Sequence, residues 1–147
     1  MNLSKTYKTI IIIVAIFFGS IIGKVSIEYF YSKSISIDDK LVLMANELNK
    51  KAPIVVDKDT RFDNVNALLD KTVQYNYTLI NYLKKDIDIN QLKINLRLPI
   101  LNYIKTNPDL KFFTDNKVTM EYVYKDKVGV FLFKLQFKYN DYKDIIQ

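Results

Sequence analysis

The chain has 147 residues and a formal net charge of +6, from 22 Lys and Arg against 16 Asp and Glu. It contains no Cys, His or Trp. Disulfides, zinc–thiolate sites and mechanisms that need a histidine base or a cysteine nucleophile are therefore excluded. Charges of both signs are mixed along the sequence, without the basic block that is typical of nucleic-acid-binding proteins. We expect no nucleic-acid partner.

The most informative segment is an uncharged, mostly apolar run from Thr9 to Gly23, which follows a short basic stretch at residues 1–8. As a helix this run would cover roughly 22 Å, which is less than the ~30 Å core of a bilayer. A helix that continues to Tyr31 would be long enough, and its last residues are aromatic, as is typical of a membrane interface. The sequence therefore predicts a single transmembrane anchor at residues 9–31.

The same run also has the length of the apolar part of a cleaved signal peptide. Its small residues at Gly19–Ser20 and Gly23 are followed by bulky or charged ones, which favours the anchor over cleavage. Lys5 and Lys8 favour an N-terminus that stays in the cytoplasm. The prediction is a single-pass protein of the bacterial inner (cytoplasmic) membrane, with its C-terminal domain periplasmic or extracellular; cleavage would give a secreted domain instead.

We expect a polar linker at residues 32–38, one exported domain at residues 39–140 and a polar tail at residues 141–147. A first helix is predicted at residues 39–52, because apolar side chains recur there at helical spacing and Pro53 follows.

The strands are predicted from alternation. Residues 73–81 place four apolar side chains on one face, and a turn at residues 69–72 would join them to a preceding strand. A second helix is predicted to begin at Asp88, and Pro99 inside its pattern leads us to expect a kink or a break near Leu98. A second hairpin is predicted with its strands at residues 118–124 and 131–139.

The expected order is thus helix, hairpin, helix, hairpin. Four antiparallel strands with one aromatic face need a cover, which the two amphipathic helices can supply. The predicted fold class is α+β: an N-terminal transmembrane helix followed by a two-layer domain of helices on an antiparallel sheet.

Three segments, residues 45–50, 56–64 and 75–82, together with Asp115–Thr119, resemble a family of small, uncharacterised bacterial proteins that are exported or membrane-anchored. The resemblance implies an N-terminal signal or anchor before a small domain. It implies no activity and no cofactor.

One charged segment stands out as a candidate site. Asp57, Asp59 and Asp63 have a spacing that distantly resembles a calcium loop, but the glycine and the bidentate glutamate of such a loop are missing. We therefore expect no metal. In an extended strand Asp57, Asp59, Arg61 and Asp63 would share a face, where they form either an internal salt-bridge network or a surface for a partner.

No nucleophile elbow, phosphate-binding glycine loop or HExxH motif occurs in the sequence. The resulting hypothesis is a membrane-anchored, non-enzymatic interaction protein without cofactors, whose exported domain binds another protein of the bacterial envelope. Two alternatives remain: an inhibitor or immunity protein acting at the membrane, and an enzyme with a carboxylate site.

Overall fold

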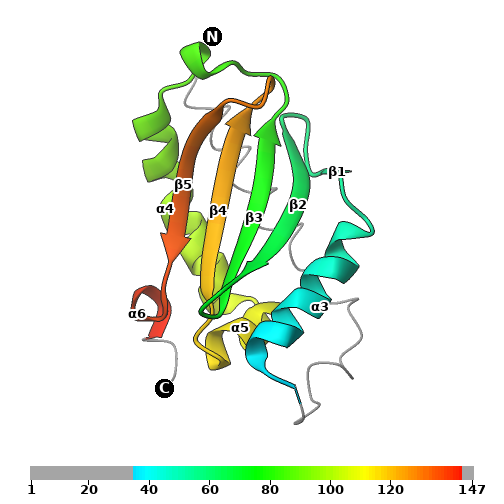
Figure 1. The fold of residues 1–147 in the computed structure, drawn as a ribbon. Helices are drawn as coiled ribbons and strands as arrows, with labels where there is room; N and C mark the ends of the chain where they lie inside the picture. The colour runs from blue at the N-terminus through cyan, green and yellow to red at the C-terminus, as the bar shows by residue number, and fades with distance from the viewer. Residues whose placement is uncertain (1–34, 144–147) are drawn as a thin grey trace.

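The computed structural model describes residues 35–143. These residues form one five-stranded sheet in the order β1-β2-β3-β4-β5, with helices packed against it (Figure 1). The elements are α3 (Ile37–Asn49), β1 (Ile54–Val55), β2 (Thr60–Leu68), β3 (Thr72–Leu79), η1 (Lys84–Asp86), α4 (Ile89–Thr106), η2 (Pro108–Leu110), α5 (Lys111–Asp115), β4 (Thr119–Asp126), β5 (Phe131–Phe137) and α6 (Tyr139–Tyr142).

The prediction of four purely antiparallel strands is wrong. The sheet has a fifth strand, β1, and its central strands β3 and β4 are parallel. The cause is the connection between them. The 18 residues of α4 span about 27 Å, which matches the roughly 26 Å of an eight-residue strand such as β3. The helix therefore returns the chain to the end of the sheet where β3 began, and β4 starts from there.

The predicted fold class also included an N-terminal transmembrane helix. Within residues 35–143 no helix has both the length and the apolar character needed to cross a bilayer. The predicted anchor at residues 9–31 lies outside the described residues. The fold that the structure shows is an α+β domain with a mixed sheet.

The predicted first helix is confirmed as α3. Ser36 caps it by accepting a hydrogen bond on Oγ from the backbone N–H of Asp39, at 3.1 Å. Its buried face, which includes Leu41, Met44 and Leu48, packs against β2.

The predicted start of the second helix is also confirmed, because Asp88 Oδ1 accepts a hydrogen bond from Gln91 N at 3.0 Å. Of the two outcomes predicted near Leu98, the break is wrong, because α4 continues through Pro99 to Thr106, and the kink stays a prediction. The proline removes one backbone bond. Two buried side chains before it and two after it hold the helix to the core: Leu92, Leu96, Ile100 and Ile104.

The core lies on the aromatic face of the sheet. Because β3 and β4 run parallel, Tyr75 lies opposite Tyr122 and Tyr77 lies opposite Tyr124. The ring centroids of these two stacked pairs are 5.5 and 5.3 Å apart. All four rings are buried, and burial raises the pKa of each of the four hydroxyls.

The outer edge of β2 is only partly covered by the two residues of β1. Beyond β1, the side chain of Asn49 makes the backbone hydrogen bonds that a neighbouring strand would otherwise make. Its Nδ2 donates to Val65 O and its Oδ1 accepts from Val65 N, both at 2.8 Å. The end of α3 thus satisfies the backbone of an otherwise open edge.

Candidate functional site

The face of the sheet opposite the core is lined by side-chain amides. Alternation along each strand fixes which residues point there, since their neighbours along the chain point into the core. We call this surface the amide face and define it by Asn64, Asn66, Gln74, Asn76, Glu121, Lys125, Lys134 and Gln136.

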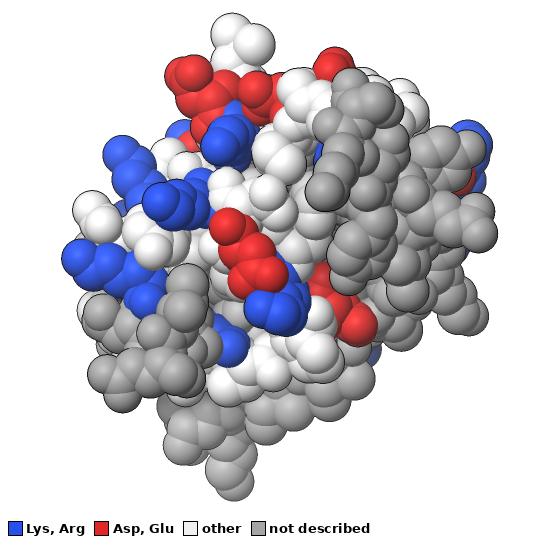
Figure 2. Space-filling model, turned by 90° about the horizontal axis from the view of Figure 1, so that it is seen from below, with Lys and Arg blue, Asp and Glu red and all other residues white. Residues whose placement is uncertain are grey.

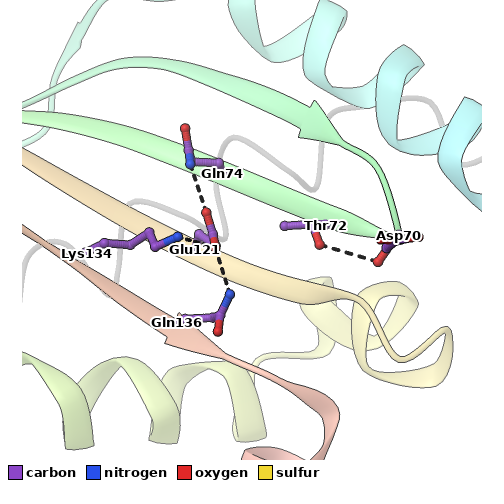
Figure 3. Close-up of polar contacts among 6 residues, drawn as sticks. All are labelled: Asp70, Thr72, Gln74, Glu121, Lys134 and Gln136. Atoms are coloured by element: carbon purple, nitrogen blue, oxygen red, sulfur yellow. Dashed lines mark hydrogen bonds and ion pairs between the residues drawn. The ribbon is translucent and has the colours of Figure 1, made fainter.

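Glu121 lies at the centre of the amide face and is only 4% exposed. Its Oε2 accepts a hydrogen bond from Gln74 Nε2 at 2.8 Å. Its Oε1 accepts one from Lys134 Nζ at 2.7 Å and one from Gln136 Nε2 at 2.8 Å. Figure 3 shows these three donors reaching the carboxylate from the two strands on either side of β4.

Two opposed effects act on the pKa of the Glu121 carboxyl. Burial raises it, while the hydrogen bonds from Lys134, Gln74 and Gln136 lower it. The hydrogen bonds prevail, so the pKa lies below its ordinary value and the group is a carboxylate at neutral pH. Glu121 therefore acts as a fixed acceptor that orients three side chains.

A bulge in β2 extends this hydrogen-bonded array. The pairing with β3 shifts between Phe62 and Asn64, so that consecutive β2 residues both bond to β3 side chains. Asn64 Oδ1 accepts from Asn76 Nδ2 at 2.7 Å, and Asp63 Oδ2 accepts from Thr78 Oγ1 at 2.6 Å. The bulge thus brings two polar side chains of β2 into contact with β3.

An open hollow of about 860 Å³ lies over part of the amide face. Phe131, one of the residues that line it, is 53% exposed. The surface thus offers both donors and acceptors, with an aromatic ring beside them. The lining residues are Asn49, Asn64, Asn66, Gln74, Asn76, Val123, Lys125, Phe131 and Lys134.

The four predicted site residues fall into two separate groups. Asp57 and Asp59 are 9% and 4% exposed and lie in a turn before β2, where Asp57 Oδ1 accepts from Asp59 N at 2.7 Å. Asn81 Nδ2 donates to Asp59 Oδ1 at 2.9 Å. Arg61 and Asp63 form a partly exposed ion pair at 2.6 Å within β2. The four side chains do not form one continuous exposed row, and their role as a partner surface stays a prediction.

Among residues 35–143, no group of three acidic, Cys or His side chains is placed to hold a metal ion.

Sequence reasoning missed the amide face. A signal was present, because Gln74 and Asn76 occupy the polar positions of a strand whose other positions are apolar. The sequence did not show which strand lies beside β3. Gln74 contacts Glu121 only because β3 and β4 pair in parallel.

Comparison with known proteins places this fold. No curated protein matches the chain. The crystal structure of a Pseudomonas aeruginosa protein described as a "putative secreted protein" is similar, with a TM-score of 0.60 at 10% sequence identity. The match covers 71% of this chain and 91% of that one, and at this identity it shows a shared fold.

The expectation of an uncharacterised family is confirmed, whereas export or membrane anchoring of its members stays a prediction. Residues 36–133 match the domain of unknown function DUF8479, which covers most of the described domain. The chain therefore belongs to the DUF8479 family.

Proposed function

We propose that this domain is exported and acts as a secreted, non-enzymatic binding domain that recognises another protein through its amide face. Two observations support export. The chain carries an N-terminal apolar run at residues 9–23 that is preceded by lysines. The similar Pseudomonas aeruginosa structure is that of a protein described as a "putative secreted protein".

The observation that carries the binding role is the hydrogen-bonded array around Glu121. Side chains that are already held in place lose little conformational entropy when a partner binds, so more of the interaction energy appears as affinity. An ordinary solvated sheet face would instead carry independent flexible side chains. On the amide face, Gln74, Lys134 and Gln136 are fixed by one buried carboxylate.

The chemistry of the face fits a polar protein surface. Each Asn or Gln amide can both donate and accept, as the backbone and the polar side chains of a partner require. Lys134 neutralises the charge of Glu121. The remaining charge on the amide face is that of Lys125, so the face is weakly positive. Phe131, which lines the hollow, supplies the aromatic contact that protein interfaces favour.

The test uses the full chain in its source bacterium, with a photo-cross-linking residue in place of Asn66. Asn66 is exposed on the amide face, whereas Asn90 is exposed on α4 and serves as the matched position. We expect one discrete cross-linked protein from position 66 and none from position 90. A second variant, Asn66→Arg, should abolish co-purification of that protein, and Asn90→Arg should not.

Equal cross-linking from both positions, or a partner that still binds Asn66→Arg, would contradict the proposal. Export is tested separately by N-terminal sequencing of the protein from the culture medium. A form that lacks the apolar run is the expected result, and protein found only in the cytosol with an intact N-terminus would refute export.

A further inference from the structure

A second hollow, of about 310 Å³, lies at the end of the molecule where the C-terminus of α4 meets α5 and α6. Figure 2 looks onto this end, and Lys and Arg side chains gather on one side of it. The hollow shares no lining residue with the amide face. It is lined by Ile104, Lys105, Thr106, Asn107, Pro108, Lys111, Thr114, Asp115, Tyr139, Tyr142 and Lys143.

The described residues that line this hollow carry a net positive charge. Three lysines, Lys105, Lys111 and Lys143, face one carboxylate, that of Asp115. The carboxylate is already paired with Lys111, at 2.9 Å. Within the described part of the chain, Lys105 and Lys143 have no carboxylate at ion-pair distance. Two ammonium groups, one in α4 and one just after α6, are therefore not neutralised by any carboxylate of residues 35–143.

The walls of the hollow are held in place. The Tyr142 hydroxyl donates to Val118 O at 2.6 Å and is buried, which fixes one ring. The Tyr139 ring lies under Lys117 Nζ, 5.0 Å from the ring centroid, which adds a further positive charge beside the hollow. Asn107 Oδ1 accepts from Asp109 N at 3.0 Å, and this bond orients its amide nitrogen as a donor.

One feature opposes anion binding here. The C-terminus of α4 carries the negative end of the helix dipole, equivalent to roughly half a charge. Lys105 lies in the last turn of this helix and offsets that half charge. The hollow remains positive after this correction.

We propose that this hollow binds a phosphate-bearing ligand. Lysine ammonium groups bind phosphate oxygens as point charges, and a volume of about 310 Å³ has room for a phosphate and a small organic group. The phosphate can belong to the headgroup of an anionic lipid or to a soluble phosphate ester. This site is independent of the protein-binding role of the amide face.

The experiment is a titration of the ¹⁵N-labelled full chain in neutral detergent, followed by NMR. One arm adds glycerol phosphate, and the other adds phosphatidylglycerol to the micelles. We expect saturable shifts at the backbone amides of Thr106, Asn107 and Thr114 in at least one arm. Added salt should weaken the binding, because salt screens exposed charges.

The double variant Lys105→Gln, Lys143→Gln should weaken binding about tenfold or more, since each lysine contributes on the order of a factor of five. The charge-matched control, Lys85→Gln with Lys127→Gln, changes exposed lysines in η1 and in the β4–β5 turn. This control should bind within about twofold of the wild type.

The two arms identify the source of the phosphate. Shifts with glycerol phosphate assign a soluble ester, and shifts with phosphatidylglycerol alone assign a lipid headgroup. The proposal is overturned if neither probe moves these amides, or if the double variant binds as tightly as the control. Neither result would affect the test of the amide face, which uses Asn66.

Discussion

Replacing Glu121 by Gln is the most direct test of the amide face. The carboxylate is 4% exposed and accepts three hydrogen bonds, of which two converge on Oε1. Glutamine keeps the shape but removes the negative charge, and its amide nitrogen would face the donor of Gln74 unless that side chain turns over. The Lys134 ammonium loses its counter-charge.

The magnitude follows from these contacts. Hydrogen bonds to a charged group contribute about 1.5–3 kcal/mol each, against 0.5–1.5 for neutral ones. Because the Lys134 side chain is 42% exposed, water recovers part of the loss. We expect Glu121→Gln to lower the free energy of unfolding by about 2 kcal/mol, which corresponds to roughly 10 °C in Tm for a domain of this size.

The assay is urea unfolding of the full chain followed by far-UV circular dichroism, since the chain has no Trp. Glu47→Gln is the matched control: Glu47 pairs with Lys50 at 2.6 Å, but its side chain is 48% exposed, so a change below about 0.5 kcal/mol is expected. Equal losses in the two variants would refute the reasoning that the carboxylate organises this face.

The pH dependence gives a second check on the same residue. The folded-state pKa of Glu121 lies below its unfolded value of 4.5. Its contribution to stability is therefore complete above that unfolded pKa and is lost as the pH falls through the lowered folded pKa. The stability difference between the wild type and Glu121→Gln should thus shrink below about pH 4.5. A difference that stays constant down to pH 2 would contradict a depressed pKa.

Three further predictions concern the hydrogen bonding of single side chains, and unfolding free energies measure all three. Asn49→Ala removes both bonds to the backbone of Val65 and should cost about 1–2 kcal/mol; a loss below about 0.5 kcal/mol would show that water replaces the amide. Tyr142→Phe leaves the buried carbonyl of Val118 without its donor and should also cost about 1–2 kcal/mol. Tyr124→Phe removes a buried hydroxyl that has no hydrogen-bond partner among residues 35–143 and should leave stability unchanged or raise it by about 1 kcal/mol. A larger loss than for Tyr142→Phe would contradict this prediction.

The sequence determined the local elements, because their signals are local. The helical spacing of Leu41, Met44 and Leu48 specified α3, and the side chain of Asp88 marked the start of α4. The turn between β2 and β3 has positive φ at Asp70 and Lys71, and the turn before β5 places Gly129 at φ 87°. Alternation also showed which side chains of each strand are apolar, and these form the core.

Only the tertiary structure decided which strand lies beside which and in what direction. Alternation has a period of two residues and contains no information about the neighbouring strand. The parallel pairing depends on α4 being long enough to cross the sheet, and it brings Gln74 beside Glu121, 47 positions later in the chain. The burial of Asp57 and Asp59 was decided in the same way, since the turn before β2 folds inward and Asn81 satisfies one of their oxygens. The hydrogen bond between Gln74 and Glu121 and the one between Asn81 and Asp59 both join segments that are distant in the sequence. Such contacts form only when the hydrophobic core brings those segments together.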